Sequence, residues 1–279
     1  MKLTYAALAA TTVLALTGCG LTGGGSDEVG TESNGVTTLT IGTSVTPHGD
    51  IWRYIDENLA ADAGLDLEIK EFTDYSLPNR ALVDGELDAN YFQHLPFLDS
   101  EREGQGYDLY NFEQGLHIEP FALYSEKHTD VAELPDGATI GINNDPANQG
   151  RALKLLADNG LIGLADGVDP ITATIHDVAE NPQNLEFVEA EAAQLARTLA
   201  DTDASVINGN NALNAGLSSK DDGLLVETPE GNPYQNVLVV RAGDEENEAI
   251  QKLNEIAHDD SVRTFIEETW PKGEVIPAF

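Results

Sequence analysis

The sequence predicts an α/β protein built as two lobes, with a hinge and a cleft between them. Three observations support this fold class. Strand-like and helix-like patterns alternate along the chain, which favours largely parallel sheets covered by helices. The part expected to fold, residues 37–279, is longer than a typical single domain. The extended segment 117–128 is suited to cross from one lobe to the other.

The strand-like segments are short, rich in β-branched or aromatic residues and bounded by turn residues. They cover residues 38–44, 65–72, 87–92, 108–115, 138–144, 171–178, 185–191, 204–208 and 236–243. The helical segments carry apolar residues three and four positions apart. They cover residues 50–64, 77–86, 147–160, 192–200, 245–259 and 261–270. We therefore expect lobe I at residues 37–121, with 240–279 returning to it, and lobe II at residues 122–239.

The N-terminus predicts a secreted protein that is anchored by lipid. Lys2 precedes a short apolar run that ends in LTGC, with Leu16 three positions before Cys19. This pattern is typical of a bacterial lipoprotein signal peptide, residues 1–18, removed before a lipidated cysteine. A diacylglyceryl group on sulfur and a further acyl chain such as palmitate give a stable anchor. Residues 19–36 are rich in glycine, serine and acid, and predict a flexible tether on the outer face of the cell membrane.

The charge of the chain is extreme. There are 49 acidic and 14 basic residues, which give a formal charge of −35. Such a chain repels nucleic acid and anionic membrane surfaces, so neither is an expected partner. The excess of acidic residues is explained either by an ordinary solvated surface or by adaptation to high salt. At 1 M salt the Debye length is about 3 Å, so repulsion between the acidic residues is screened.

Enzyme motifs are absent from the sequence. It contains no G-x-S-x-G, H-E-x-x-H or phosphate-binding G-x-x-x-x-G-K-[ST] pattern, and its single cysteine is taken by the predicted lipidation. The six histidines are scattered, without a ligand pair two or four positions apart. The sequence therefore predicts no catalysis, no cofactor and no metal. Anchor, tether and a two-lobed α/β domain together indicate an extracytoplasmic solute-binding protein, with its ligand between the lobes.

Several polar and aromatic side chains follow predicted strands, where a cleft would expose them. An asparagine in the N-cap position of the helix at 147–160, with an arginine three positions on, suits a carboxylate. Taken alone, each asparagine could equally be a turn or cap residue, each aromatic a core residue, and the arginine a surface charge. The candidate ligand-binding residues are Tyr75, Phe92, Gln93, His94, Asn148, Arg151, Asn208 and Asn236.

The order of motifs along the chain resembles the NlpA/MetQ lipoproteins, the methionine-binding components of ABC importers. The resemblance runs from Cys19 to the C-terminal PKGEVIPAF. It is carried by TPHGDI, FTDYSLPNRAL, DANYFQHLPFL, INNDPANQGRALKLL, ENPQNLEFVEAEAAQLARTL, VINGNNALNAGL and NPYQNVLVVR. The resemblance implies a type II periplasmic (solute) binding protein fold that closes over L-methionine.

The resemblance also implies roles for individual residues. It places Tyr75, Phe92 and His94, with Gln93 beside them, around the methionine side chain and the wall of lobe I. It assigns the ligand carboxylate to Arg151. The asparagines Asn208 and Asn236 would hydrogen-bond the amino-acid backbone. A thioether favours the aromatic faces, at about 0.3–1.5 kcal/mol per contact.

The resemblance has departures and leaves alternatives open. Asn211 stands where the family's tyrosine is expected, Ala196 where proline is common, and Gly49 and Asp50 replace a more usual Ala-Glu. The implied partners are L-methionine, an ABC permease with its ATPase, and the membrane through Cys19, for a chain that is otherwise a monomer. The alternatives are another amino acid, D-methionine or a methionine-containing dipeptide, or an envelope lipoprotein such as an adhesin without a transport role.

Overall fold

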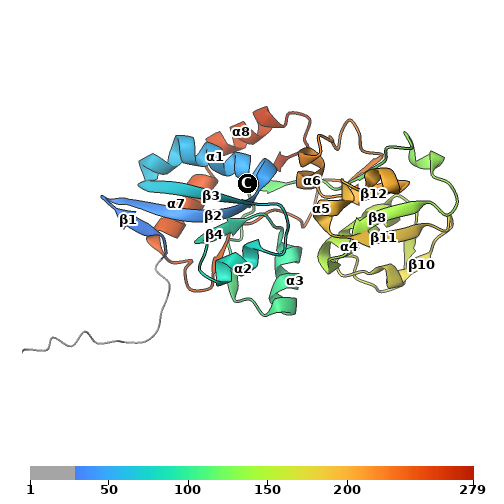
Figure 1. Ribbon diagram of the computed structural model, residues 1–279, viewed down its shortest axis with the longest axis horizontal. Helices are drawn as coiled ribbons and strands as arrows, with labels where there is room; N and C mark the ends of the chain where they lie inside the picture. The colour runs from blue at the N-terminus through green and yellow to red at the C-terminus, as the bar shows by residue number, and fades with distance from the viewer. Residues whose placement is uncertain (1–28) are drawn as a thin grey trace, which may run out of the picture.

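The computed structural model describes residues 29–279, which form two lobes side by side along the longest axis of the molecule (Figure 1). The predicted signal peptide at 1–18 and the predicted lipidation site Cys19 lie outside the described residues. None of the described helices combines the length and the apolar character needed to cross a membrane. Each lobe has its own sheet, and each sheet has its own cluster of buried apolar side chains.

The sheet of lobe I has the order β1-β2-β4-β14-β5, and β3 pairs with β2 beside this path. β2 runs parallel to β3 and β4, whereas β14 runs antiparallel to β4 and β5. The strands are β1 (Thr31–Ser33), β2 (Val36–Ser44), β3 (Leu65–Phe72), β4 (Ala89–Tyr91), β5 (Leu109–Asn111) and β14 (Val239–Arg241). The last strand belongs to this sheet although it follows the whole of lobe II in the sequence, so lobe I is discontinuous.

The first strand corrects the expected tether. β1 lies within residues 19–36 and forms an antiparallel hairpin with β2. The turn consists of Asn34 and Gly35, with φ angles of 54° and 83°. Two consecutive positive φ angles define the type I′ turn, for which Asn-Gly is the preferred pair. The folded part therefore begins before residue 37, because an Asn-Gly hairpin signal is embedded in otherwise tether-like sequence.

Helices cover both faces of the lobe I sheet (Figure 1). They are α1 (Asp50–Ile55), α2 (Pro78–Val83), α3 (Leu95–Gln105), α7 (Glu248–Ala257) and α8 (Asp260–Thr269). α1 continues through further helical turns to Ala63, and Gly64 ends the run with a φ of 74°. On α7 the buried side chains Ala249, Ile250 and Leu253 recur at helical spacing and join the core of β2 and α1.

Lobe II has a sheet of order β11-β8-β12-β7-β13, in which β8 runs parallel to both β11 and β12. Its strands are β7 (Ala122–Tyr124), β8 (Thr139–Asn143), β11 (Glu186–Ala190), β12 (Ala204–Ile207) and β13 (Leu225–Val226). A separate hairpin pairs β9 (Gly163–Leu164) with β10 (Val178–Glu180). The helices are α4 (Pro146–Asp158), α5 (Ala192–Leu195) and α6 (Gly209–Asn214). The carboxyl end of β8 leads into α4, and that of β12 leads into α6, so both helices start at the same edge of the sheet.

Two segments connect the lobes within the described residues. The first passes from β6 (His117–Ile118) to β7, and the second returns from β13 to β14. β6 pairs with the C-terminal β15 (Ile276–Pro277), and His117 also forms a bridge with Asn236 on the returning segment. The two connections therefore lie side by side, which is the arrangement expected of a hinge.

Candidate functional site

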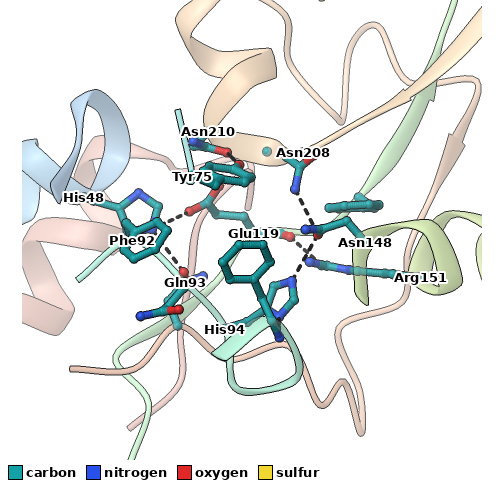
Figure 2. Close-up of a pocket in the computed structure, with 14 residues that line it drawn as sticks. His48, Tyr75, Phe92, Gln93, His94, Glu119, Asn148, Arg151, Asn208 and Asn210 are labelled. Carbon is teal, nitrogen blue, oxygen red and sulfur yellow. Dashed lines mark hydrogen bonds and ion pairs between the residues drawn. The ribbon is translucent and has the colours of Figure 1, made fainter. Parts of the chain in front are cut away.

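A cavity lies between the lobes, and side chains from both lobes and from both connections line it (Figure 2). All the candidate residues from the sequence line this cavity: Tyr75, Phe92, Gln93, His94, Asn148, Arg151, Asn208 and Asn236. The structure adds lining residues that the sequence reasoning did not select: His48, Phe97, Glu119, Phe121, Gly209 and Asn210.

An aromatic group forms one wall of the cavity. Tyr75, Phe92 and Phe97 pack with their ring centres 5.8 to 6.0 Å apart, at tilted and edge-to-face angles. Ala147 at the start of α4 joins the same apolar cluster from lobe II. Such a wall suits an aliphatic or thioether side chain, because sulfur makes favourable contacts with aromatic rings.

The Tyr75 hydroxyl joins the two lobes. It donates a hydrogen bond to Oδ1 of Asn210 at 2.6 Å and accepts one from Nδ2 of Asn211 at 3.1 Å. Burial raises the pKa of this phenol well above its ordinary value, so the hydroxyl keeps its proton and remains a donor. Asn211 therefore takes part in a contact between the lobes.

His94 also connects the lobes, and the structure settles the role of each ring nitrogen. Nδ1 accepts the backbone N–H of Phe97 at 3.1 Å and so caps α3. Nε2 then carries the proton and donates it to Oδ1 of Asn148 on α4, at 3.1 Å. Burial, with a smaller contribution from Arg151, lowers the pKa of His94 to about 3. The imidazole is neutral at physiological pH and acts as a fixed hydrogen-bonding wall.

The asparagines of lobe II form a chain behind His94. Nδ2 of Asn208 donates to Oδ1 of Asn148 at 3.0 Å, and Nδ2 of Asn143 donates to Oδ1 of Asn208 at 2.9 Å. The prediction that Asn148 occupies the N-cap position of α4 is wrong. Asp145 is the N-cap and accepts the backbone N–H of Asn148, because Pro146 occupies the first helical position.

Gln93 lines the cavity, but the amide group of its side chain makes most of its hydrogen bonds to residues outside the cavity. Its Nε2 donates to Oδ1 of Asn79 at 2.6 Å and to Oδ1 of Asn90 at 3.0 Å. Its Oε1 accepts from Nδ2 of Asn79 at 2.9 Å. This buried amide network holds the end of β4 against α2, so Gln93 shapes the wall from behind.

Arg151 already has an anionic partner. Its Nε and Nη2 donate to the two carboxylate oxygens of Glu227, at 3.0 and 2.5 Å. Nη2 also donates to the backbone carbonyl of Glu119 at 2.8 Å. The guanidinium lies over the rings of Phe121 and Tyr234, at 3.9 and 4.2 Å from their centres. Burial alone would raise the pKa of Glu227, but the charge and hydrogen bonds of Arg151 outweigh burial and lower it.

This pairing changes what Arg151 can do. A buried arginine that lacked an anion would exclude neutral ligands, but Glu227 supplies the anion from within the protein. Nη1 donates no hydrogen bond to another residue in the described part of the chain, so one edge of the guanidinium remains for a ligand.

A second polar group lies at the hinge end of the cavity, where His48, His117 and Glu119 converge. Oε1 of Glu119 is 2.7 Å from Nε2 of His117 and 3.3 Å from Nε2 of His48. Nε2 of His48 is also 3.1 Å from Oδ1 of Asn236. Burial lowers the pKa of His48 to about 4 and that of His117 to about 3, and it raises the pKa of Glu119.

The same three side chains are the one group among the described residues whose donor atoms lie close enough to hold a metal ion, all within 4.8 Å. Sequence reasoning missed this group because the separation of His48 from the other two follows no motif. The sequence HIE at 117–119 places the second histidine and the glutamate together, but only the hinge geometry brings His48 to them.

Comparisons with known proteins agree on one family. The sequence model of the family described as NlpA lipoprotein matches residues 39–279. The methionine-binding lipoprotein MetQ of Bacillus subtilis is 40% identical over 251 residues, 89% of this chain and 90% of the relative. The D-methionine-binding lipoprotein MetQ of Escherichia coli is 43% identical over 71% of this chain and 73% of its own.

The solved structures give the same result. The structure of a nutrient binding protein from Burkholderia cenocepacia bound to methionine superimposes with a TM-score of 0.82 at 38% identity. The match covers 86% of this chain and 100% of that one. The two-lobed solute-binding fold expected from the sequence is thereby confirmed.

Proposed function

The chain belongs to the NlpA lipoprotein family, and from this premise we propose that it captures methionine between its lobes as the binding component of an ABC importer. The observation that carries the proposal is the composition of the interlobe cavity. Its walls combine an aromatic group, a buried arginine and several amides, drawn from both lobes. A ligand in this cavity contacts both lobes at once and therefore stabilises their closure.

The proposed role of each residue in binding follows from the groups that face the cavity. Tyr75, Phe92 and Phe97 would contact the thioether chain. The free Nη1 edge of Arg151 would hold the carboxylate. The asparagines retain donors as well: Asn208 has a second hydrogen on Nδ2, and Asn236 has the whole Nδ2 group. These donors would bind the backbone of the amino acid.

The proposal includes the setting of the protein. The lipidated Cys19 would hold it at the outer face of the cell membrane, and residues after it would let the lobes reach a permease driven by an ATPase. We propose a monomer, with the lobes divided at residues 121/122 and 239/240. The first boundary is supported by β7, which begins at Ala122, whereas β14 of lobe I begins at Val239, one residue before the second boundary.

Isothermal titration calorimetry on the purified chain tests the proposal. L-methionine should bind with one site per chain, and an excess of another amino acid such as L-alanine should not displace it. Native mass spectrometry of the untreated protein should show the mass of a ligand that co-purifies. If neither L- nor D-methionine produces heat or raises the melting temperature, the proposed function is wrong.

A methionine-containing dipeptide is a second candidate, because the ligand cavity has a neighbour. A second hollow lies beyond Tyr75, and Ala196, Asn210 and Asn211 line it. Tyr75 and Asn210 belong to both spaces. A ligand longer than methionine could extend past this tyrosine. Competition between L-methionine and glycyl-L-methionine in the same calorimeter separates the two candidates.

A further inference from the structure

The second hollow, beyond Tyr75, differs in charge from the rest of the molecule. Lobe I contributes the ends of β2 and β3 and the segment that follows β3, and lobe II contributes α6 and the region around α5. Besides Tyr75, the polar side chains that line it are Ser44, Thr73, Arg197, Asn210, Asn211 and Asn214. No acidic residue of the described part of the chain lines this hollow, although the whole chain has a formal charge of −35.

Arg197 is the one arginine among residues 29–279 that has neither an ion pair nor an aromatic partner. Arg263 lies over the ring of Phe279, 4.8 Å from its centre. The remaining arginines form ion pairs with carboxylates: Arg53, Arg80, Arg102, Arg151 and Arg241. The Arg197 side chain is exposed and lines the hollow, so its N–H donors are open to a ligand there.

A third hollow, which shares Tyr75 and Ala193 with the second, has the opposite charge. It is lined by two acidic side chains from each lobe: Asp74, Glu101, Asp145 and Glu191. Carboxylates on both walls repel an anion. An anionic group that passes Tyr75 is therefore favoured on the side of Arg197 and disfavoured on the other side.

The boundary between the ligand cavity and the second hollow contains side chains that hydrogen-bond one another. Tyr75 and Asn210 line both spaces and lie side by side (Figure 2). The Tyr75 hydroxyl donates to Oδ1 of Asn210 and accepts from Nδ2 of Asn211. Nδ2 of Asn210 and Nδ2 of Asn214 donate to no other side chain or carbonyl within residues 29–279, so both remain donors for an anion. A bond to an anion is stronger than the neutral bonds it would replace.

Resting on the proposed function, we propose that the second hollow is an extension subsite for a ligand whose sulfur carries, in place of the methyl group, a chain that ends in a carboxylate. Tyr75 belongs to the wall assigned to the thioether, so a chain that grows from the sulfur reaches the hollow past this ring. Arg197 binds the terminal carboxylate, and the amides of Asn210 and Asn214 donate to it. The ligand class is therefore the S-alkylated homocysteines with an anionic end.

Isothermal titration calorimetry on the purified full chain tests this subsite with three compounds. They are L-methionine, S-(2-carboxyethyl)-L-homocysteine and the amide of that side chain, S-(2-carbamoylethyl)-L-homocysteine, which has the same length without the charge. We expect the wild type to bind the carboxylate at least ~10-fold more tightly than the amide. Arg197→Gln should remove this preference and should change the affinity for L-methionine less than ~3-fold.

Two further variants serve as controls. Arg197→Lys keeps the charge and should retain part of the preference for the carboxylate. Arg80→Gln removes the same charge from a side chain on α2 that is 71% exposed, and it should leave the preference unchanged. This comparison separates a contact with Arg197 from the general repulsion of anions by an acidic chain.

The other outcomes overturn the inference. Equal affinities of the wild type for the carboxylate and the amide would show that the hollow does not select charge. A wild type that binds L-methionine but neither longer compound would show that the boundary is closed to ligands. A preference that survives Arg197→Gln, or that Arg80→Gln also removes, would not belong to Arg197. Binding of the carboxylate without L-methionine would overturn the proposed function and support the subsite, and binding of none of the three would overturn both.

Discussion

Removing Arg151 should destabilise the fold as well as the site. In the Arg151→Ala variant Glu227 stays in place, with a side chain that is only 14% exposed and no cation. The variant loses three charge-assisted hydrogen bonds, two to Glu227 and one to the backbone carbonyl of Glu119, worth about 1.5–3 kcal/mol each. It also loses the stacking of the guanidinium on Phe121 and Tyr234, which adds to the largest loss expected in the free energy of unfolding. Relaxation and water entry reduce these sums, and breaking one partner of a buried pair costs about 3–5 kcal/mol.

The measurement is urea unfolding followed by far-ultraviolet circular dichroism, which reports on both lobes. We expect Arg151→Ala to lower the free energy of unfolding by about 4 kcal/mol, and the melting temperature by roughly 8–16 °C. The surface variant Arg80→Ala is the control, because Arg80 and its partner Asp84 are 71% and 53% exposed, and it should cost less than about 1 kcal/mol.

A double variant tests the mechanism. Arg151→Met with Glu227→Leu removes both charges together and should cost much less than the two single variants added, since no unpaired charge remains. A loss below about 1 kcal/mol in Arg151→Ala would refute the reasoning. So would strict additivity in the double variant, because the two residues would then not be coupled.

Three further predictions follow from the same structure. The melting temperature should rise from 0.1 to 2 M NaCl, because salt screens repulsion within a chain of formal charge −35; a fall would contradict this. The imidazole NMR signals of His48, His94 and His117 should not titrate between pH 8 and 5, and a midpoint above 6 in any of them would be inconsistent with the burial described. The folded pKa values of these histidines lie below the ordinary 6.5, so the unfolded state binds more protons than the folded state as the pH falls from 6.5 toward about 4. The histidines therefore lower the free energy of unfolding in that window. Glu119, whose pKa is raised in the folded state, contributes in the opposite direction. Tyr75→Phe should lower the free energy of unfolding by about 1–2 kcal/mol in the same urea assay, because Oδ1 of Asn210 loses its donor; an unchanged value would show that the bridge between the lobes contributes nothing.

Sequence patterns predicted most of the elements that bury a regular face. β2, β3, α4, α7 and α8 follow the alternation or helical spacing of their apolar residues. Elements with few buried residues were missed or misplaced. α3 buries only Phe97 and Leu98, and its N-cap is His94, whose ring nitrogen replaces the usual capping side chain. Residues 171–178 fold mainly as a turn in which Asp177 accepts from Thr174.

The candidate site was likewise predicted only in part from the sequence. The side chains at strand ends could be predicted because parallel strands place their carboxyl ends together. The partners of those side chains could not, because no spacing rule relates them. Glu227 lies 76 positions from Arg151, and Asn236 lies 188 positions from His48. Only the return of the chain through the hinge brings these pairs into contact.

The bonds between the lobes have a kinetic consequence. His94 donates to Asn148, Tyr75 donates to Asn210 and Asn211 donates to Tyr75, so each bond joins one lobe to the other across the cleft. A molecule enclosed by the lobes leaves only after these three bonds have opened, whatever its own contacts contribute. At about 0.5–1.5 kcal/mol each, the three bonds together slow escape by roughly 10- to 2000-fold. The residence time of a ligand is therefore set in part by hydrogen bonds within the protein itself. A docking partner that separates the lobes would release the ligand without replacing any of the contacts that the ligand makes.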